Sequence, residues 1–515
     1  MTTIPQNQEL LNQLTQLLQA HRHLFRQERI FQRVALLVVA EIIVFARHTV
    51  TQLLMGLGLS EVDWSSWYRL FSHGRFPYDE ASAVLFGETW KQVGPEDVYV
   101  VAGDGAQTRR SSRKMEGAHW LHNPQSPVFK RGIHIAQRWF NGSWLMPAEN
   151  GYSRALPLRW LPAFTEKSQP QTTTPCKEWE AAVAFLTWLK QQLAAQGRAG
   201  QPVLMVANGH YDTLKLWKYL PVGVILLTRS ARNRVLWHLP GPDARKNCKY
   251  GERAPTPADY WGQRKEWRRL VLTVQNRPRH LQVKVAGPFL RKGAAERPLF
   301  LIVVRGKGNK RTRRQPLPFL VNAVQDTAGE WVLPLPVADL LFWAWQRWEV
   351  EVAHRELKSN FGLGNKQCWQ PTAAVLSVQW SAWVYALLLL AGYRCWGLTG
   401  APAVPSRWWR GSGRWSLNTL WHSYRAALWG DHQFQPIDPG SLLTRGGFAL
   451  DSASIAPCSL RCGPILAHSS SLTDCRHAKK PSASAEGFFK MPKSRAASKS
   501  SGSTCCLQLS KTDGG

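Results

Sequence analysis

Apolar residues recur at every third or fourth position from residue 8 to about 95, as in "ELLNQLTQLLQA" and "RIFQRVALLVVAEIIVFA". This spacing places them on one face of an α-helix, so it predicts helices that share a core. Within "HTVTQLLMGLGLSEVDWSSWYRLF" we expect one helix to end near Gly56 and Ser60 to cap the next. We therefore expect residues 1–95 to form an all-helical domain. The helix pair is interpreted as a DNA-binding helix-turn-helix, with plain helical packing as the alternative.

A different pattern begins near residue 97. "DVYVVAG" (97–103), "PVLMVAN" (202–208) and "GVILLTR" (223–229) are short apolar runs of the kind that form buried strands. Between the first two, alternating runs flank Asn141–Gly142, which predicts a β-hairpin there. An amphipathic helix is expected from Cys176 to Gln196, and a short helix around "TLKLWKYL". Three antiparallel strands followed by helix, strand, helix and strand is the order of the ribonuclease-H-like fold, a mixed α/β sheet with helices on its faces.

The remaining segments complete the expected organisation. Pro- and Arg-rich sequence with the β-patterned runs "RRLVLTVQ", "HLQVKVAG" and "PLFLIVVRG" predicts a β-rich, basic insertion that leaves the core and returns. The tail is dominated by Ser, Gly, Ala and Lys, a composition that cannot bury a core, and is expected to be disordered. The expected domains after the helical one are the first part of the core (96–230), the insertion (231–330), the second part of the core (331–395), a C-terminal extension (396–440) and the tail (441–515).

Charge narrows the choice of partner. The chain has 65 Lys and Arg against 34 Asp and Glu, a net charge of +31 that is spread over many segments. This surplus favours nucleic acid over a membrane surface, since no basic amphipathic anchor stands out; a merely soluble basic protein is the alternative. "RGKGNKRTRR" (305–314) suits phosphate contacts from a hairpin loop, with a solvated loop as the alternative. The candidate DNA-binding residues are Arg109, Arg110, Arg311, Arg313 and Arg314.

Localisation signals favour the cytoplasm. The N-terminus lacks a basic start followed by an apolar run, and the nine cysteines lack the spacing of a zinc site. We expect these cysteines to be reduced. The apolar stretch 373–393 is long enough to span a membrane, but it contains Gln379 and two Trp, so it is expected to be a buried helix. No membrane partner is expected.

The helical stretch "QRWEVEVAHRELKSNFGLG" (346–364) contains three acids. Because an α-helix turns about 100° per residue, Glu351 shares a face with Arg347 and Lys358, at the edge of an apolar stripe. The other two acids, Glu349 and Glu356, are expected to face solvent. A surface set of salt bridges is the alternative interpretation. Glu351 is the acid that we expect to be functional.

Asp104, in "VVAGDGAQ", is the second candidate acid. It is expected to end the first strand, between glycines that allow a ligand to approach closely; an ordinary Gly-rich turn is the alternative. A carboxylate here, a second group at the end of strand 202–208, and Glu351 on a later helix are expected to converge. Such oxygen ligands suit Mg²⁺, with Mn²⁺ as a substitute, so Asp104 and Glu351 are the expected metal ligands. A metal held there activates a water or a 3′-hydroxyl for attack on a phosphodiester.

These segments resemble the DDE transposases of bacterial insertion sequences, in the branch marked by Tyr-x2-Arg-x3-Glu-x6-Lys. Arg347, Glu351 and Lys358 match the last three positions in spacing, and the first position falls on Ala344. "GDGAQTRR" resembles the first Asp motif of the family and "VANGHYDTLKLWKYLPVGVILLTRSARN" the second, so that the likeness covers roughly residues 30 to 395. The resemblance implies a homo-oligomer, associated with the nucleoid, that cuts DNA at the element ends and joins them to a target by metal-dependent phosphoryl transfer.

The second block departs from the family pattern. The family has Asp where this chain has Asn208, and Asn offers a neutral oxygen without the negative charge that holds Mg²⁺. Asp212, four residues later, is a substitute carboxylate or, alternatively, the cap of the following helix. The implied catalytic set is Asp104, Asn208, Asp212 and Glu351, supported by Arg347 and Lys358. Because of Asn208, the alternative function is a catalytically impaired DNA-binding relative or a decayed copy.

Overall fold

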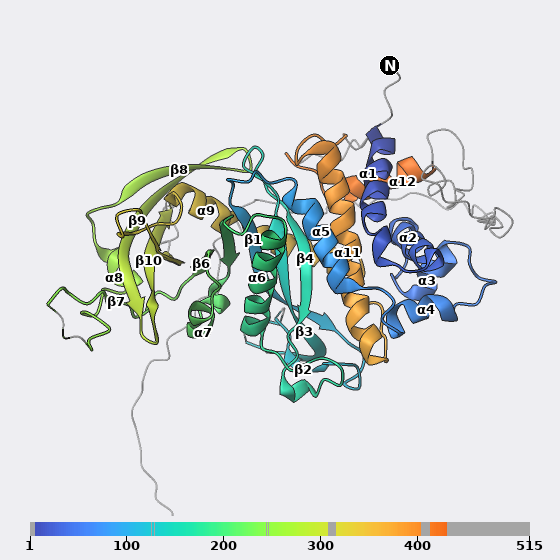
Figure 1. Ribbon diagram of the computed structural model, residues 1–515, viewed down its shortest axis with the longest axis horizontal. Helices are drawn as coiled ribbons and strands as arrows, with labels where there is room; N and C mark the ends of the chain where they lie inside the picture. Colours follow the sequence, from blue (N-terminus) through green and yellow to red (C-terminus); the bar gives the residue numbers. More distant parts are fainter. Residues whose placement is uncertain are drawn as a thin grey trace, which may run out of the picture. The chain divides into compact units, whose positions relative to one another are not determined.

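The N-terminal segment forms helices, as the apolar periodicity predicts. In this computed structural model, which describes residues 6–124, 126–127, 129–243, 245, 247–306, 316–402 and 413–429, the long helix α11 (Pro371–Trp396) packs against α1, α4 and α5 of this segment (Figure 1). The N-terminal helices are α1 (Gln6–Ala20), η1 (Arg22–Leu24), α2 (Glu28–Ile43), α3 (Val50–Gly56), α4 (Ser65–Ser72) and α5 (Tyr78–Trp90).

One predicted helix boundary is wrong. The residue before the first turn of α4 is Trp64, not Ser60. The Oδ1 of Asp63 accepts a hydrogen bond from the backbone N–H of Ser65 at 2.9 Å, so a carboxylate satisfies one of the free N–H groups of the first turn. The preceding helix, α3, is capped by the Thr49 hydroxyl, which accepts from the N–H of Gln52.

Eleven of the described strands form one sheet, in the order β2-β3-β1-β5-β6-β11-β10-β9-β7, with β4 paired to β3 and β8 to β9. Strands β1, β5 and β6 are parallel, and β3 and β4 are added antiparallel to this centre. The mixed sheet with its helices confirms the ribonuclease-H-like fold and the helical region before it. The strands of this half are β1 (Tyr99–Arg109), β2 (His119–His122), β3 (Ile133–Leu145), β4 (Ala155–Pro162), β5 (Val203–Ala207) and β6 (Val224–Arg229), with η2 (Glu166–Ser168), α6 (Glu178–Ala195), η3 (Gly209–Tyr211) and α7 (Leu214–Lys218) between them.

The hairpin predicted at Asn141–Gly142 is wrong. Both residues lie inside β3, opposite Asp104 and Gly103 of β1. Glycine is needed here because a Cβ on Gly142 would lie 2.5 Å from the ring of Phe185 on α6. The chain turns nine residues later, at Asn150–Gly151, where both φ angles are positive (52° and 75°). An Asn-Gly pair does form the turn of this hairpin, but it is Asn150–Gly151 and not Asn141–Gly142.

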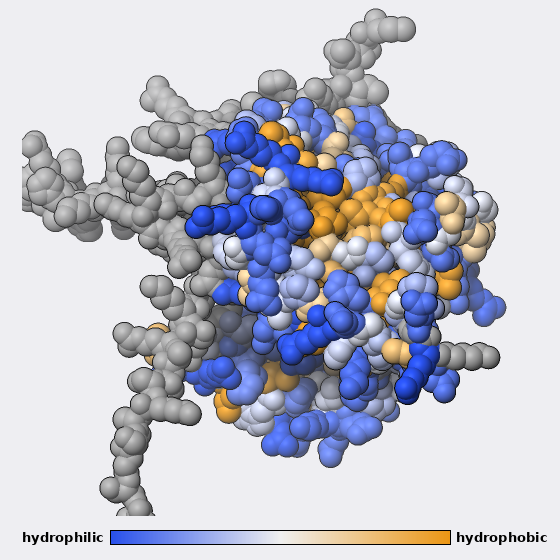
Figure 2. All heavy atoms as spheres, turned by 90° about the vertical axis from the view of Figure 1, so that its left-hand side faces the viewer, coloured by the Kyte–Doolittle hydropathy of each residue, from blue (hydrophilic) through white to orange (hydrophobic). Residues whose placement is uncertain are grey.

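The expected insertion continues the core sheet. Strand β11 pairs antiparallel with β6, and β10 and β9 extend the sheet from there. Figure 2 shows the side on which β7 to β10 lie, and it is mostly hydrophilic around a hydrophobic area. Arg268 and Arg269 of β8 and Arg277 of β9 are exposed. The elements here are β7 (Trp237–His238), α8 (Pro257–Gly262), β8 (Arg268–Val274), β9 (Arg277–Arg291), β10 (Ala294–Gly306), β11 (Leu317–Asn322), and a two-stranded ribbon of β12 (Val324–Gln325) and β13 (Trp331–Val332).

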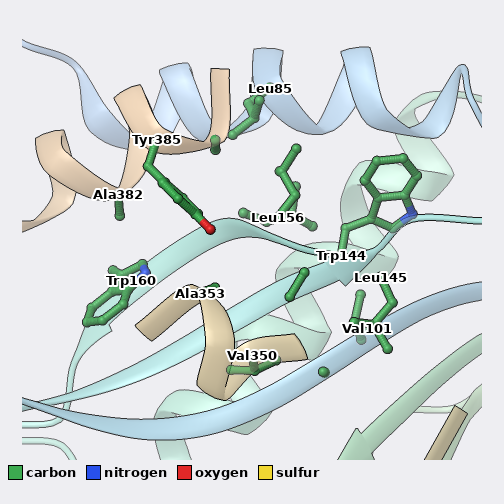
Figure 3. Packing of buried hydrophobic residues seen from close by; sticks show 14 of the residues in the cluster. Leu85, Val101, Trp144, Leu145, Leu156, Trp160, Val350, Ala353, Ala382 and Tyr385 are labelled. Carbon is green, nitrogen blue, oxygen red and sulfur yellow. The ribbon is translucent and has the colours of Figure 1, made fainter. Parts of the chain in front are cut away.

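The chain then returns to the core through helices. In Figure 3, Val350 and Ala353 of α10 and Tyr385 of α11 lie around Leu156 and Trp160 of β4, all of them buried. Helix α11 is long and apolar enough to cross a membrane, and its most apolar 18-residue window is completely buried in the fold, as predicted from its Gln and Trp residues. The last helices are α9 (Val337–Gln346), α10 (Trp348–Ser359), α11 and α12 (Leu417–Trp429).

Candidate active site

Asp104 lies within β1, one position beyond the last parallel pair between β1 and β5, which joins Gly103 and Ala207. The expectation that Asp104 ends its strand is wrong, because β1 continues to Arg109 through its pairing with β3. Side chains alternate across a strand. Gly103 and its partner Gly142 face Phe140 and Phe185, whereas Asp104 shares the opposite face with Asn141, which contacts His354 of α10. The sheet therefore presents Asp104 to α10.

Glu351 and Asp104 meet at one guanidinium. Arg347, the residue that joins α9 to α10, places Nη2 at 2.6 Å from Glu351 Oε1 and Nη1 at 3.8 Å from Asp104 Oδ2. Asp104 is 8% exposed, while the Glu351 side chain is 36% exposed, so the pair spans from the sheet to the surface. Nη1 is buried and has no hydrogen-bond partner among the described residues. A buried donor without a partner is costly unless a ligand oxygen reaches it.

Asn208 is the third group of the site. It follows β5 and precedes η3, where its Oδ1 accepts the backbone N–H of His210 at 2.8 Å. Since an amide carries an oxygen on one side and an NH₂ group on the other, this contact orients the NH₂ group away from His210. Nδ2 donates to Asp104 Oδ1 at 2.7 Å. The amide that replaces the expected acid is therefore already bonded to the first acid.

The electrostatics of the site favour protonation of Asp104. Burial raises the pKa of the Asp104 carboxyl to about 6, and the negative charge of Glu351 acts in the same direction, while Arg347 and the N–H of Gly105 oppose the increase. A carboxylate with this pKa is partly protonated near neutral pH. Positive charge placed beside it, from a cation or from further arginine contact, lowers its proton affinity.

The prediction that Glu349 and Glu356 face solvent is wrong. Glu356 is 9% exposed, and its Oε2 accepts hydrogen bonds from Arg154 Nη2 and from the Tyr385 hydroxyl, both at 2.6 Å. Glu349 is 6% exposed and pairs with Arg414 Nη2 at 2.5 Å. Glu351, with a side chain 36% exposed, is separate from these two buried acids, as the helix geometry predicts. The buried face was misassigned, because the polar face of α10 is covered by Arg154, the residue before β4, and by Arg414, in the segment before α12.

Asp212, the predicted substitute carboxylate, lies away from the site. Asp212 does not join Asp104: its carboxylate is buried, pairs with Arg234 and Arg291, and accepts from Ser230 and from the Trp217 indole. It is not the cap of α7 either, because Thr213 has that position. Asp212 thus links α7, β9 and the segment that follows β6, which excludes it from the site.

The basic residues also divide. Arg110 is 3% exposed and donates to Gln137 and to the carbonyls of Lys366 and Ala374, so the prediction that it contacts DNA is wrong. Arg109 is exposed at the end of β1, as a DNA contact requires. Lys358 has an exposed side chain, whose partial burial lowers the pKa of its ammonium group, while the negative charge of Asp104 opposes this decrease. The remaining predicted contacts, Arg311, Arg313 and Arg314, lie outside the described residues, as does the tail from 441.

Two neighbours of the site were missed from sequence. His354, one turn after Glu351, is buried, and burial lowers its pKa to about 3, so it is neutral and its Nε2 accepts from Asn141 Nδ2 at 3.0 Å. On the other face of β1, the Glu178 carboxylate lies against Gly105, where a Cβ would be 2.5 Å from Oε1. The helical spacing of His354 from Val350 signals its burial, whereas nothing local signals Glu178.

Comparison with known proteins identifies the family of the chain. A family model described as DDE superfamily endonuclease matches residues 13–286, which is more than half of the chain and includes Asp104 and Asn208. The chain therefore belongs to the DDE superfamily endonucleases. No curated protein matches it. Membership implies DNA as the substrate, and members of this superfamily generally use divalent metals.

Proposed function

We propose that the chain is a transposase that cleaves DNA at the Asp104–Glu351 site, and that Asn208 makes the natural chain a weak enzyme. One observation carries the proposal: Asp104 of β1 and Glu351 of α10, which are far apart in the sequence, both pair with the guanidinium group of Arg347. Surface salt bridges do not require a buried strand residue as a member. Convergence of acids at a strand and a helix is the arrangement that a metal-dependent phosphoryl transferase needs.

The donor set fits a divalent cation, although incompletely. Asp104 and Glu351 are the residues that would hold it, since carboxylate oxygens are the ligands that Mg²⁺ and Mn²⁺ prefer. Asn208 presents N–H to Asp104, and among the described residues no three His, Cys, Asp or Glu side chains are grouped to hold a metal ion. The set therefore supports weak binding. When bound, the cation supplies Lewis-acid activation of a water or 3′-hydroxyl and neutralises charge on the phosphodiester.

The side chains of this chain have separate roles in that reaction. Arg347 Nη1, which lies 3.8 Å from Asp104 Oδ2 and has no hydrogen-bond partner among the described residues, would donate to an oxygen of the scissile phosphate and so hold it beside Asp104. Exposed Lys358 and Arg109 add positive charge at the mouth of the site. His354, neutral and buried behind Glu351, keeps α10 in register with β3 through Asn141.

The finer features of the family resemblance belong to the same proposal. Arg347, Glu351 and Lys358 keep the spacing of the Tyr-Arg-Glu-Lys branch, and the net charge of +31 suits a chain that holds both element ends and target DNA. Strand transfer by a homo-oligomer in the bacterial cytoplasm, at the nucleoid, follows from that branch. The alternative function is a DNA-binding relative that does not cleave. It is favoured by the Asn208–Asp104 hydrogen bond, which occupies one oxygen of the first acid.

Strand cleavage tests the proposal. The full chain is incubated with a labelled duplex carrying the ends of its element, with Mg²⁺, with Mn²⁺ or with a chelator. We expect slow, cation-dependent nicking that Asp104→Asn abolishes. Cleavage that survives Asp104→Asn would place the chemistry elsewhere, and binding with no cleavage under any cation would leave the non-cleaving relative as the function.

A further inference from the structure

The short helix η3 determines how the side chain at position 208 is held. Asn208 is the residue before this helix: its Oδ1 accepts the backbone N–H of His210 at 2.8 Å, and its carbonyl oxygen accepts that of Tyr211 at 3.1 Å. A helix of three residues has too few hydrogen bonds of its own to fix its orientation. The direction in which position 208 points, toward Asp104, therefore depends on contacts that η3 makes with the rest of the fold.

Tyr211, the last residue of η3, makes these contacts. Its side chain is buried, and its ring meets Phe140 of β3 at 6.0 Å and an angle of 69°. Its hydroxyl donates to Glu178 Oε1 at 2.7 Å. Burial raises the pKa of Tyr211 well above its usual range, and the negative charge of Glu178 acts in the same direction, so the hydroxyl keeps its proton. The hydroxyl is thus a lasting donor to Glu178.

Glu178 is held in a position that the stability of its own helix does not require. It is the first residue of α6, where a negative charge is favourable. A side chain that faced solvent would give the same benefit, yet this one is only 12% exposed and lies against Gly105, where a Cβ would be 2.5 Å from Oε1. Its charge also raises the pKa of Asp104, which disfavours the ionised form of that acid. The inward placement therefore indicates a second role.

A continuous series of contacts leads from α6 to the site. Glu178 holds the Tyr211 hydroxyl, Tyr211 is joined to Asn208 through η3, and Asn208 Nδ2 donates to Asp104 Oδ1 at 2.7 Å. Asp212, which follows η3, is fixed separately by its own ion pairs. Loss of the Tyr211 hydroxyl therefore leaves the path of the chain in place and releases the orientation of the turn.

We propose that Tyr211 and Glu178 are positioning residues, which orient the side chain at position 208 toward Asp104. The inference rests on the proposed function and deepens it, because it assigns to two residues outside the site the control of its third group. Neither residue touches the substrate. Groups that hydrogen-bond behind a metal site commonly change its metal affinity by about 10- to 100-fold. In the variant Asn208→Asp, the pair would direct the added carboxylate toward the cation.

The first test measures the affinity of Mn²⁺ alone for the full chain carrying Asn208→Asp, from the electron paramagnetic resonance of free Mn²⁺. Tyr211→Phe removes the hydroxyl and keeps the ring against Phe140. Tyr99→Phe is the matched control, because it removes another buried hydroxyl, which hydrogen-bonds to that of Thr89 at 2.8 Å. We expect Tyr211→Phe to weaken Mn²⁺ binding by about 10- to 100-fold and Tyr99→Phe by less than about twofold.

Two variants of Glu178 separate positioning from charge. Glu178→Gln keeps an acceptor oxygen for the Tyr211 hydroxyl and should keep most of the Mn²⁺ affinity. Glu178→Ala removes the acceptor and should weaken binding as much as Tyr211→Phe does. Equal losses in the two Glu178 variants would overturn the inference in favour of a pure charge effect. An effect of Tyr211→Phe no larger than that of Tyr99→Phe would also overturn it.

The second test needs no cation and uses the natural chain. Urea unfolding gives a double-mutant cycle of Asn208→Ala and Tyr211→Phe. We expect Asn208→Ala to destabilise the chain less when the Tyr211 hydroxyl is absent, whereas its effect should add to that of Tyr99→Phe, at the other end of the pairing between β1 and β5. If Asn208→Asp binds no Mn²⁺, the cation site of the proposed function fails, and this cycle alone decides: coupling supports the positioning role, and additivity with Tyr211→Phe overturns it.

Discussion

Asn208 donates its side-chain N–H to Asp104 Oδ1 at 2.7 Å, with its own oxygen held by the backbone of His210. The residue that departs from the family pattern is thus part of a satisfied hydrogen-bond chain. A second carboxylate at this position would face the first one without a donor between them. The substitution Asn208→Asp, which would complete a metal site, therefore also removes a hydrogen bond that stabilises the fold.

Asn208→Asp should destabilise the chain without divalent metal and make its stability respond to metal. We expect a loss of about 1.5–3 kcal/mol in chelator, because a hydrogen bond to a charged group is replaced by like-charge repulsion. Mg²⁺ should restore much of this loss by binding the folded state, while the natural chain should respond weakly. Thermal unfolding at pH 8 with and without Mg²⁺ measures both effects. Identical stability of the two chains in chelator would show that position 208 does not face Asp104.

Gly142→Ala should destabilise the chain through Phe185. The new Cβ lies 2.5 Å from a completely buried ring, so we expect a cost of about 1–3 kcal/mol in the free energy of unfolding. In a Phe185→Ala background the cost should largely disappear. Gly87→Ala on α5 is the matched control: nothing lies within 4 Å of its Cβ, and alanine there should stabilise by about 0.5–1 kcal/mol. A cost that is independent of Phe185 would support a turn at Gly142 instead.

Replacing the acids of α10 should destabilise the fold by different amounts. Glu356→Gln leaves the buried Arg154 without its charge partner and should cost about 3–5 kcal/mol. Glu351→Gln breaks a partly exposed pair and should cost less than about 1 kcal/mol. Urea unfolding of the two variants measures the difference. Equal costs would mean that Glu356 faces solvent, as the helix pattern alone suggests.

His354 should make the fold sensitive to acid. Its folded pKa of about 3 is below the ordinary value of 6.5, so the unfolded chain binds a proton that the folded chain does not. Stability from this residue is complete above pH 6.5 and is lost as pH falls toward 3, by up to about 1.4 kcal/mol per pH unit. His354→Gln should flatten that dependence, and His122→Gln, at an exposed histidine, should not. Parallel pH curves for the natural chain and His354→Gln would contradict the burial of a neutral imidazole.

Local pattern predicted most elements of the fold. Strands 202–208 and 223–229 and the helix expected from Cys176 to Gln196 lie where their patterns predict them, because a buried strand and an amphipathic helix each have a local sequence signal. The hairpin prediction at Asn141–Gly142 was wrong because a glycine is also needed where a strand packs against an aromatic ring. That ring belongs to Phe185, more than forty residues away in the sequence, so no local pattern reveals it. The insertion strands joined the core sheet through pairing of β11 with β6, which no local window contains.

The site was predicted only in part, because some of its features depend on contacts between segments that are far apart in the sequence. Asp104 and Glu351 were found from a strand, a helix and their charges, and the structure brings them together. Asp212 was misjudged because its partners, Arg234 and Arg291, come from segments that the sequence gave no reason to place beside it. Arg110 was misjudged because a basic run near a site suggests contact with DNA. In the fold, its guanidinium group instead donates hydrogen bonds to three buried acceptors.

Strand cleavage by Asn208→Asp tests most directly the claim that Asp104, position 208 and Glu351 form one cation-dependent site. The added acid supplies the missing charge, so Mg²⁺-dependent cleavage of the element ends should rise about 100-fold or more over the natural chain. Glu351→Gln in that background should abolish the gain, and Glu330→Gln, an exposed acid elsewhere, should keep it. A variant carrying Asn208→Asp that folds, binds DNA and cleaves no faster than the natural chain would contradict the account.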